Sequence, residues 1–418
     1  MKMGCENVKL FLRKPLTFGK KEQMPKAVMG QDGSIKLPEE FLRRRRLTQG
    51  VEWWLDQRDL ALILLPRLAD LRKLYVEPTT VCNLNCRTCI RNIWKDPKAH
   101  MEMETLRQLV DQTTDFPELQ RVVFSGLGEP LTHPHILDMV RLVRERDLAV
   151  TIGSNGLLLD KAMSRELVAL GVDRLIVSLD GVTHETYASV RGAEISRVLD
   201  NIRGLNAAKR ELGSLTPTLG IEFVALRSNI AEFADLTGLA SRLGASRVLV
   251  SNVLAYTDEM RDEILYGYEP RPPFSAGSWP VKIDAWVMWG TLELPRMHWG
   301  AEQHCRFVRD RAMVVGWDGS VAPCFAFSHN YSYLSIDGRR KQVTRYDLGN
   351  LAQQSLLEIW TSEEYCRFRN EVRDFHFPSC PDCDLRESCD LREQNKGCWG
   401  WNPSCADCLW AQDIVRCP

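Results

Sequence analysis

The chain has 418 residues, of which 44% are hydrophobic and 26% are charged, a composition typical of a globular protein with two or three domains. The formal net charge is -1, so the overall charge gives no indication of a nucleic-acid or acidic-membrane partner. We find no run of about 18 apolar residues and no signal-peptide pattern. We therefore expect no membrane contact and a cytoplasmic location.

The 14 cysteines are the unusual feature of the composition. Three lie at positions 82, 86 and 89, ten lie between positions 305 and 417, and Cys5 stands alone. In a large chain without a secretion signal, clustered cysteines indicate metal ligation rather than disulfides. We therefore expect both clustered sets to hold metal, and Cys5 to be incidental.

Residues 1–25 carry no clear pattern and are expected to form a lead segment, whereas residues 26–68 look like a separate module. The segment KAVMGQDGSIKLP is typical of two short strands joined at the hairpin dipeptide Asp32-Gly33. A short helix begins at Pro38 and two glutamates, and VEWWLDQRD and LALILLP form a second strand pair. This order resembles an AbrB-like swapped-hairpin module, which implies a small β-rich fold that dimerises or docks a partner.

The same module contains the basic run Arg43 to Arg46, and AbrB-like modules often bind DNA. One short basic run beside acidic residues is more often a solvated surface. We therefore expect a homodimer or a docked protein partner here, rather than nucleic acid.

Between residues 70 and 255, apolar strand patterns alternate with amphipathic helix patterns. The strand candidates are residues 74–78, 121–126, 149–154, 174–180, 219–226 and 247–253. Six βα repeats predict a parallel sheet, because each crossover helix returns the chain to the same end of the sheet. Six units are two short of a full barrel, so we expect an α/β fold with a partial (β/α)6 TIM-type barrel.

An irregular, aromatic stretch at residues 256–300 follows the predicted barrel, with Trp279, Trp286, Trp289 and Trp299 in it. We interpret it as a bridge, whose rings either line a substrate cavity or fill the core between two domains. Residues 301–418 form a cysteine-rich domain with short helices, such as SLLEIWTSEEYCRFRNEV.

The segment YVEPTTVCNLNCRTC places Cys82, Cys86 and Cys89 directly after the first barrel strand. Three thiolates can bind three irons of a [4Fe–4S] cluster, which leaves the fourth iron open for a substrate or cofactor. The loop lies at the carboxyl end of the strand, where βα folds place their chemistry. The alternative is a structural zinc site, but zinc needs a fourth ligand nearby, and no further Cys or His occurs between Cys89 and His100.

Polar motifs also follow the next three strands: FSGLGEP at 124–130, IGSNG at 152–156 and VSLDG at 177–181. Tyr187 and the pair Arg191-Gly192 come next. With the cysteine triad, these motifs resemble the radical SAM superfamily over residues 70–255. The resemblance implies that the open iron binds the amino and carboxylate groups of S-adenosylmethionine. An electron from the cluster then cleaves the S–C5′ bond, and the 5′-deoxyadenosyl radical takes hydrogen from a substrate.

The resemblance also implies a set of cofactor-binding residues but assigns no catalytic side chain. FSGLGEP would hold the amino group of the methionine moiety, Ser154 and Asn155 the ribose, and Arg191 the carboxylate. The whole implied set is Gly126, Gly128, Glu129, Pro130, Ser154, Asn155, Ser178, Asp180 and Arg191. The alternative role for a single polar residue is a helix cap or a turn contact.

The adenine contacts are predicted separately. Strands five and six are expected to supply apolar side chains, with Ile221 and Val253 as candidates. Many members of the family have an aromatic residue where this chain has Thr88, so we expect a differently lined adenine pocket.

The later cysteines form two recognisable spacings. Cys305 and Cys324 fit C-x13-G-x4-C around Gly319, and Cys380, Cys383 and Cys389 fit C-x2-C-x5-C. These spacings resemble the SPASM domain, which implies one or two auxiliary iron–sulfur clusters, although Glu393 stands where the family has its next cysteine. The expected auxiliary ligands are Cys305, Cys324, Cys380, Cys383, Cys389, Cys398, Cys405, Cys408 and Cys417.

The partition of these ligands is open at this point. One cluster is expected on Cys305, Cys324 and Cys398 with an unknown fourth ligand. The other would take Cys380, Cys383, Cys389 and one of Cys405, Cys408 or Cys417, and structural zinc on some of them is the alternative. Cys366 lies in a helical pattern and is expected to be a buried thiol.

The ending GCWGWNPSCADCLWAQDIVRCP and the segment CRTCIRNIW resemble a narrower group, the maturases linked to tungsten-containing aldehyde:ferredoxin oxidoreductases. The resemblance implies a protein or peptide substrate, namely that oxidoreductase, its cofactor or an associated peptide. Ferredoxin or flavodoxin would supply the electron. Two alternatives stay open: modification of a small ribosomal peptide, and an iron–sulfur redox-sensing DNA-binding regulator.

Overall fold

The structure is a computed structural model that describes residues 27–32, 34–44, 50–58, 61–269, 271, 279, 290–300 and 303–417. The chain divides into two compact units, Met1–Trp53 and Trp54–Pro418. The predicted lead segment, Cys5, Gly33, Arg45, Arg46, Trp286 and Trp289 lie outside the described residues.

The smaller unit contains the first predicted hairpin and helix. Strands β1 (Val28–Met29) and β2 (Ile35–Lys36) pair antiparallel, and the Asp32 carboxylate accepts a hydrogen bond from the backbone N–H of Ser34 in the turn (3.0 Å). Helix α1 (Glu39–Arg44) begins with the two glutamates, which favour the positive end of the helix dipole.

The second hairpin, β3 (Trp53–Arg58) and β4 (Ala61–Pro66), falls almost entirely in the larger unit. The Trp54 indole N–H donates to the carbonyl of Thr361 (2.9 Å), far along the chain. The elements predicted for residues 26–68 are therefore present, but the structure divides them between two units at Trp53.

Six parallel strands in chain order form the centre of the larger unit. They are β5 (Lys73–Val76), β6 (Arg121–Phe124), β7 (Ala149–Ser154), β8 (Arg174–Ser178), β9 (Thr218–Ala225) and β10 (Ala245–Asn252). Each pairs with the next in parallel register. Their apolar side chains are almost all buried, as expected for strands covered on both faces. The six predicted strands and the mostly parallel α/β fold are confirmed.

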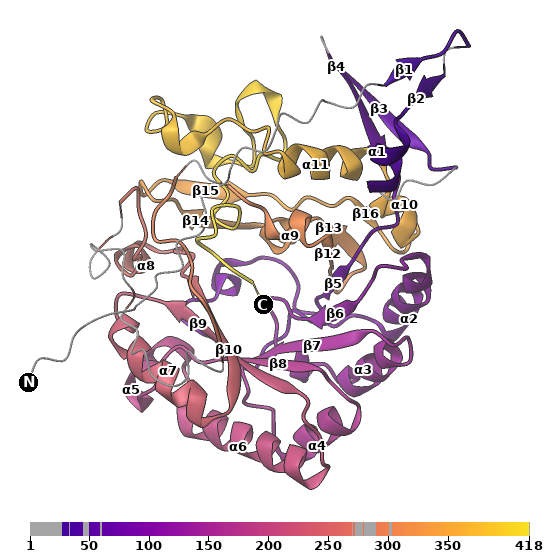
Figure 1. The fold of residues 1–418 in the computed structure, drawn as a ribbon. Helices are drawn as coiled ribbons and strands as arrows, with labels where there is room; N and C mark the ends of the chain where they lie inside the picture. The colour runs from indigo at the N-terminus through magenta and orange to yellow at the C-terminus, as the bar shows by residue number, and fades with distance from the viewer. Residues whose placement is uncertain are drawn as a thin grey trace, which may run out of the picture. The chain divides into compact units, whose positions relative to one another are not determined.

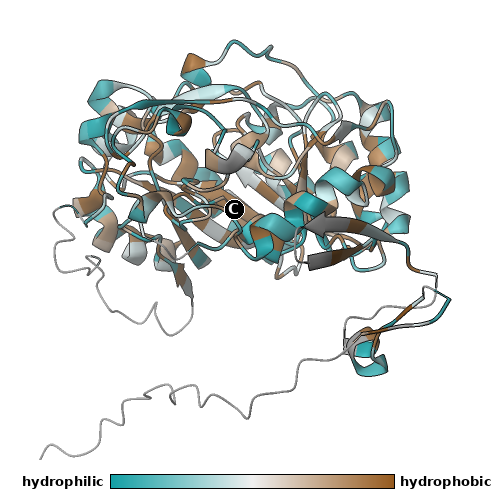
Figure 2. Cartoon of the chain, turned by 90° about the horizontal axis from the view of Figure 1, so that it is seen from above, coloured by the Kyte–Doolittle hydropathy of each residue, from teal (hydrophilic) through white to brown (hydrophobic). Residues whose placement is uncertain are grey.

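Helices follow the strands and cover the outer side of the curved sheet (Figure 1). They are α2 (Met103–Asp111), α3 (Ile136–Arg144), α4 (Lys161–Ala169), α5 (His184–Arg191), α6 (Ile195–Glu211), α7 (Phe233–Arg242) and α8 (Asp258–Asp262). Figure 2 shows both hydrophilic (teal) and hydrophobic (brown) residues on the helices of the chain. None of the helices in the described residues reaches the length and apolarity that crossing a membrane requires.

The sheet has ten strands, because segments beyond residue 255 join both edges of the predicted six. Strand β11 (Thr291–Glu293) pairs parallel with β10, and β12 (Ala312–Val315) pairs parallel with β5. Strand β13 (Ser320–Ala322) returns antiparallel through a turn at Gly319 (φ +76°), and β16 (Gly349–Asn350) pairs with β13. These short strands satisfy backbone groups that an open barrel would leave unpaired at its edges.

The rest of the C-terminal part contains few regular elements. They are α9 (Arg306–Arg309), β14 (Tyr331–Leu334), β15 (Arg340–Val343), α10 (Leu356–Trp360) and α11 (Glu363–Arg373). Ser355 and Glu358 form a capping box on α10. Beyond α11, the described chain forms only short 3-10 turns, so the cysteine-rich loops take their shape mainly from side-chain and turn contacts.

A buried histidine joins the C-terminal part to the barrel. His329 Nε2 lies 2.8 Å from Glu77 Oε2, and His329 Nδ1 lies 3.3 Å from Asp96 Oδ2. Trp94 stacks on the imidazole, with ring centroids 4.2 Å apart. Burial opposes a charge on His329, but the two carboxylates outweigh it and raise the pKa of the imidazole. The other Glu77 oxygen accepts the backbone N–H of Leu127 (2.8 Å), so this ion pair also positions the loop after β6.

Replacing His329 with glutamine is expected to destabilise the protein by about 3 kcal/mol, because Glu77 is left buried without its cation. The contribution of His329 is fully present below the unfolded pKa of histidine, about 6.5, and is lost as the pH rises through the raised folded pKa. The parent should therefore lose more thermal stability over that range than the variant, which keeps only the pH dependence of the other groups. Thermal unfolding of both proteins from pH 6 to 9 measures this. An equal pH slope in the variant would contradict the assignment.

Candidate functional site

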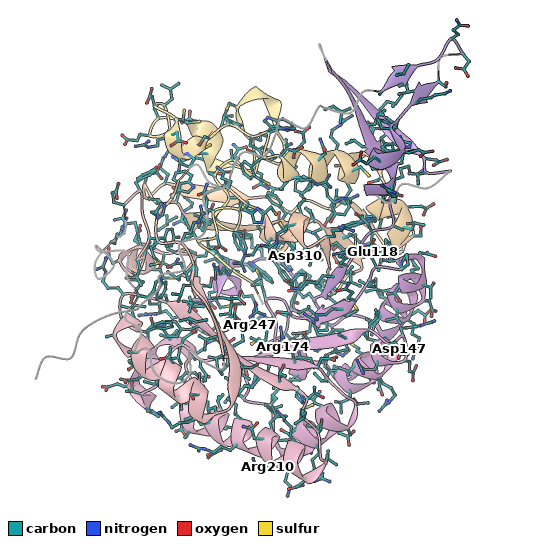
Figure 3. All side chains as sticks on the ribbon, viewed as in Figure 1. Glu118, Asp147, Arg174, Arg210, Arg247 and Asp310 are labelled. Carbon is teal, nitrogen blue, oxygen red and sulfur yellow. The ribbon has the colours of Figure 1, made fainter. Side chains whose placement is uncertain are left out.

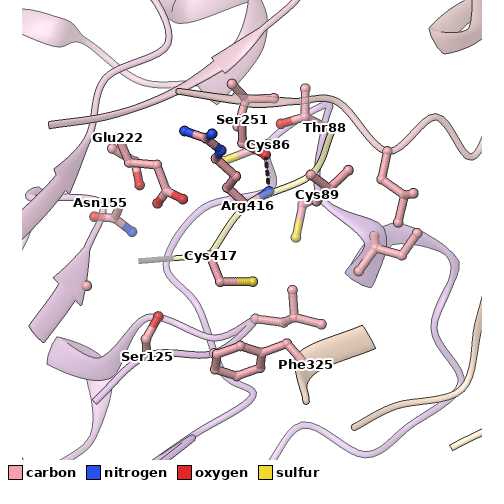
Figure 4. Close-up of a pocket in the computed structure, with 18 of the residues that line it drawn as sticks. Cys86, Thr88, Cys89, Ser125, Asn155, Glu222, Ser251, Phe325, Arg416 and Cys417 are labelled. Carbon is pink, nitrogen blue, oxygen red and sulfur yellow. Dashed lines mark hydrogen bonds between the residues drawn. The ribbon is translucent and has the colours of Figure 1, made fainter. Parts of the chain in front are cut away.

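A cavity of about 300 Å³ lies at the carboxyl ends of the parallel strands. All three triad cysteines line it, and most of the predicted cofactor-binding residues do as well. Figure 4 labels Cys86, Cys89 and Asn155 among them. The predicted residues that line it are Cys82, Cys86, Cys89, Gly126, Gly128, Glu129, Ser154, Asn155, Ser178 and Arg191. Motifs spread over more than 100 residues therefore converge on one site, as the carboxyl ends of neighbouring parallel strands require.

The loop that carries the triad is held in place through its backbone. Asn92 Nδ2 donates to the carbonyl of Cys86 (3.0 Å), and the backbone N–H of Arg87 donates to the carbonyl of Val190 (2.8 Å). Cys86 is buried, and Cys82 and Cys89 are half-buried. Burial raises the pKa values of the Cys86 and Cys89 thiols, so the positive charge of bound iron is what would ionise them.

The donor set fits an iron–sulfur cluster with an open iron. The three thiols are free and line one cavity, and the charges that act on Cys86 include those of both other thiols. Within the described part of the chain, no three His, Cys, Asp or Glu side chains converge on a single ion position. A cluster takes each thiolate on a different iron, so three free thiols that line one cavity suit it.

The two glycines of FSGLGEP are needed for packing against the triad loop. A Cβ at Gly128 would lie 2.7 Å from the carbonyl carbon of Thr79, and one at Gly126 would lie 2.5 Å from Oε1 of Glu77. Both distances are too short for a real side chain. The glycines therefore bring the backbone of this loop against the segment between β5 and the triad, rather than only against a ligand.

Glu129 connects two cofactor loops. Its carboxylate accepts hydrogen bonds from the Ser154 hydroxyl (2.8 Å), the backbone N–H of Asn155 (2.6 Å) and the backbone N–H of Leu131 (3.1 Å). Burial raises the pKa of this carboxyl, while these donors oppose the shift. A carboxylate can accept about four hydrogen bonds, so capacity for one from a ligand ammonium remains.

Arg191 lies beside the triad. Its Nε donates to Asp180 Oδ2 (2.6 Å), and its Nη1 lies 3.9 Å from Cys86 Sγ. Burial opposes the guanidinium charge, but Asp180 and Cys86 raise its pKa. Asp180 also accepts the backbone N–H of Val224 (2.8 Å) and does not line the cavity. Arg191 is therefore a cation beside Cys86 of the triad, and Asp180 is its positioning partner.

Some predicted residues lie elsewhere. Pro130 opens a short 3-10 turn outside the cavity lining, and Tyr187 is fully buried. Val253 and Thr88 line the cavity, but Ile221 does not. The Ile221 prediction is wrong because successive strand residues point to opposite faces, and its neighbour Glu222 takes the cavity face.

Glu222 is a cavity residue that the sequence analysis missed. It lies on β9, is hydrogen-bonded to Ser178, and appears beside Asn155 in Figure 4. Burial raises the pKa of Glu222 to about 7, although Arg191 and Ser178 oppose the shift. The signal was available, because one acidic residue interrupts the apolar strand LGIEFVAL.

Replacing Glu222 with glutamine is expected to stabilise the protein, most strongly at alkaline pH. A carboxyl whose folded pKa is raised favours folding only while it is protonated, so its contribution is lost as the pH rises from about 4.5 through about 7. One pKa unit corresponds to about 1.4 kcal/mol. The difference in free energy of unfolding between the variant and the parent should therefore grow by about 1 kcal/mol between pH 6 and pH 8.5. Thermal unfolding of both proteins at the two pH values measures it, and a constant advantage would contradict the shift.

The C-terminal part forms the opposite wall of the cavity. Phe325 and Tyr331 line it, together with Trp410, Arg416 and Cys417. The Trp410 indole N–H donates to Cys417 Sγ (3.2 Å), and burial raises the pKa of this thiol to about 12. No motif or spacing predicted that residues so far along the chain reach the barrel cavity.

Four of the later cysteines lie near one another. Charges on Cys305, Cys324 and Cys408 raise the pKa of the Cys405 thiol. Charges on Cys305 and Cys408 likewise raise the pKa of the Cys324 thiol. Burial is the first cause that raises the pKa of each of these thiols. The backbone N–H of His304 donates to the carbonyl of Ala411 (2.6 Å), which ties the two segments together. The structure thus groups Cys405 and Cys408 with Cys305 and Cys324, where the sequence analysis expected Cys398.

The remaining cysteines separate into two cases. A charge on Cys398 helps to raise the pKa of the Cys380 thiol. The backbone N–H of Cys383 donates to the carbonyl of Cys380 (3.3 Å), and Arg339 donates to the carbonyl of Cys389 (2.9 Å). Cys366 is buried on α11 as expected, with Arg369 Nη2 3.5 Å from its sulfur. The second group therefore contains Cys380 and Cys398, and Cys366 stands apart from both groups.

The comparisons with known proteins agree with this geometry. Residues 76–233 match the radical SAM superfamily, and residues 305–384 match the SPASM iron-sulfur cluster-binding domain. The structure of Streptococcus suis SuiB bound to S-adenosylmethionine has a TM-score of 0.53 at 16% identity, covering 81% of this chain and 74% of that chain, and this likeness concerns the fold.

Two curated relatives are informative. The tungsten-containing aldehyde ferredoxin oxidoreductase cofactor-modifying protein of Pyrococcus furiosus is 36% identical over 351 residues, which span 83% of this chain and 97% of that protein. The PqqA peptide cyclase of Gluconobacter oxydans is 29% identical over 187 residues, 44% of this chain and 49% of that protein. The chain therefore belongs to the radical SAM superfamily, as a SPASM-containing enzyme of the family of the Pyrococcus protein, with S-adenosylmethionine and iron–sulfur clusters as its cofactors.

Proposed function

We propose that this enzyme is a maturase that modifies a tungsten-containing aldehyde ferredoxin oxidoreductase, its cofactor or an associated peptide. One observation carries the proposal: the identity to the Pyrococcus furiosus cofactor-modifying protein extends over 97% of that protein. It includes both the barrel and the cysteine-rich part, so the relationship is not confined to the shared radical SAM barrel.

In this proposal, Cys82, Cys86 and Cys89 hold the cluster that binds S-adenosylmethionine. When bound, this cluster supplies the electron that cleaves S-adenosylmethionine to methionine and a 5′-deoxyadenosyl radical. Cys417 also lines the cavity, but the charges that act most strongly on its thiol belong to Glu222, Lys73 and Cys408, not to the triad. The triad thus keeps three thiol ligands, as an open iron requires.

The other cavity residues bind and orient. Glu129 holds the loops after β6 and β7 together and has acceptor capacity left for an ammonium group. Asn155 Nδ2 lies 3.8 Å from Cys82 Sγ and donates to Asn83 (2.7 Å), so it links the ribose-binding loop to the triad loop. Arg191 places a positive charge beside Cys86, where a carboxylate would be favoured.

We also propose two auxiliary clusters, each with four cysteines. One would use Cys305, Cys324, Cys405 and Cys408, and the other Cys380, Cys383, Cys389 and Cys398. This partition replaces the one expected from the sequence and leaves Cys417 as a cavity residue. The support is that charges on other cysteines of the first group raise the pKa values of Cys324 and Cys405. In the second group, a charge on Cys398 helps to raise the pKa of Cys380.

The remaining partners follow from the chemistry. We propose ferredoxin or flavodoxin as the electron donor, a cytoplasmic location, and dimerisation or docking through the AbrB-like elements. Because the chain is an enzyme, we do not propose the DNA-binding regulator.

The experiment is co-expression of a tungsten-containing aldehyde ferredoxin oxidoreductase with this chain, with its Cys86→Ala variant, or alone. We expect full aldehyde oxidation, and a mass change in the extracted cofactor or in the oxidoreductase, only with the parent chain. Equal activity and mass in all three samples would contradict the proposal.

A second candidate is supported by the PqqA peptide cyclase relationship, which covers 44% of this chain. In that case, the substrate is a small peptide. Anaerobic affinity purification separates the two: a metalloenzyme that co-purifies supports the first candidate, and a short peptide that loses hydrogen atoms on incubation supports the second.

A further inference from the structure

The segment Trp410–Cys417, here called the tail segment, forms one wall of the cavity. It is fixed to the carboxyl end of β10. The backbone N–H of Arg416 donates to Ser251 Oγ (3.0 Å), a bond drawn in Figure 4, and Asn252 Nδ2 donates to the carbonyl of Ile414 (3.1 Å). Arg416 is therefore held at a set place in the cavity wall.

Arg416 has one guanidinium nitrogen without a partner. The residue is only 8% exposed. Its Nε donates to Asp413 Oδ1 (2.9 Å) and its Nη2 to Asp413 Oδ2, but its buried Nη1 finds no hydrogen-bond partner among the described residues. A buried, charged donor without an acceptor is unfavourable, so an acceptor at this point would be bound tightly.

A chain of ion pairs holds Arg416 in place. Asp413 pairs with Arg306 (3.0 Å), Arg306 with Glu293 (3.5 Å), and Glu293 with Arg247 (2.8 Å). Arg247, labelled in Figure 3, lies on β10. Three arginines in this network share two carboxylates, and Arg247 also acts on the cavity carboxyl of Glu222, whereas Arg416 Nη1 has no partner among the described residues. The guanidinium is thus preorganised for one more anion.

S-adenosylmethionine has one carboxylate, and the triad already has a cation for it. Arg191 lies 3.9 Å from Cys86 Sγ, and its charge is the first electrostatic influence on that thiol after burial. The charges that act most strongly on the pKa values of the Cys86 and Cys89 thiols do not include the charge of Arg416. The second cation in the cavity is therefore available to a second ligand.

We propose that Arg416 Nη1 binds an anionic group of the substrate, a carboxylate or a phosphate, and so sets which part of the substrate faces the triad. This inference rests on the proposed radical function of the cavity, but not on the identity of the oxidoreductase. Arg416 is a binding and specificity residue here, supplied by the tail segment and held by Asp413.

The test uses the full chain with its clusters reconstituted anaerobically. Inorganic phosphate and acetate are titrated by calorimetry, with and without saturating S-adenosylmethionine, into the parent, Arg416→Gln and Arg416→Lys. We expect one saturable anion site that persists with S-adenosylmethionine and is weakened by about tenfold or more in Arg416→Gln. Arg416→Lys, which keeps the charge, should recover part of the affinity. Arg345→Gln is the control, because Arg345 pairs with Asp318 and Asp347 away from the cavity.

Two results would overturn the inference. One is anion binding that is equal in the parent and in Arg416→Gln, when both contain the same amount of iron. The other is displacement of the anion by S-adenosylmethionine together with an affinity for S-adenosylmethionine at least about tenfold weaker in Arg416→Gln, which would assign Arg416 to the cofactor instead. No turnover is needed, so anion binding at Arg416 in a protein that matures no oxidoreductase would contradict only the proposed function.

Discussion

Replacing Cys86 with alanine is expected to remove about four irons per chain and to abolish cleavage of S-adenosylmethionine. Cys86 is the buried member of the triad, and its thiol lies between Arg191 and the charges of Cys82 and Cys89. With only two thiols left, the cavity can no longer hold a cluster with one open iron. The loss should therefore be complete, unlike the partial losses expected from polar cavity residues.

Iron analysis and measurement of 5′-deoxyadenosine after reduction with dithionite check this expectation. Cys366→Ala is the matched control, since Cys366 is also a buried free thiol but lies on α11 beside Arg369. It should keep the full iron content and the full yield of 5′-deoxyadenosine. Full iron in Cys86→Ala, or an equal loss in both variants, would remove the triad from its assigned role.

The second large effect concerns the auxiliary clusters. Cys405→Ala is expected to lose about four irons, because Cys405 lies among the charges of Cys305, Cys324 and Cys408. Cys417→Ala is expected to keep all of its iron, because Cys417 contacts Trp410 in the cavity and is not needed for either group of four. Iron and acid-labile sulfide analysis of the two variants distinguishes the partitions.

The expectation from sequence left Cys417 among the possible ligands, so this pair of variants decides between the two assignments. Loss of iron from Cys417→Ala would restore it as a ligand. Retention of iron in Cys405→Ala would contradict the first group of four.

The barrel could be predicted from the sequence because its signals are local. Each strand is a short apolar run, and each cofactor motif follows a strand directly, so the topology of a parallel sheet brings the motifs together. Cys82, Glu129, Asn155 and Arg191 line or adjoin one cavity for that reason.

The other wall of the cavity could not be predicted because it depends on contacts between distant segments. Arg416 reaches the cavity through hydrogen bonds from the tail segment to β10, about 165 positions apart in sequence. The pairing of β12 with β5 and the His329–Glu77 ion pair are of the same kind. No periodicity or spacing within one segment encodes such contacts.

The cysteine partition shows the same limit. Spacing within a motif identified each candidate ligand, but the grouping depends on how separate loops fold back on one another. Cys405 and Cys408 join Cys305 because residues 303–305 and 406–411 are hydrogen-bonded together. Sequence distance gave no means to choose Cys405 and Cys408 over Cys398.

The most direct test of the account is the product of the reaction at the triad. The parent chain, reconstituted anaerobically and reduced with dithionite, is incubated with S-adenosylmethionine, and 5′-deoxyadenosine and methionine are quantified by chromatography and mass spectrometry. We expect both products in equal amounts, and more of them when the tungsten-containing oxidoreductase is present. A fully iron-loaded protein that forms no 5′-deoxyadenosine under these conditions would contradict the account.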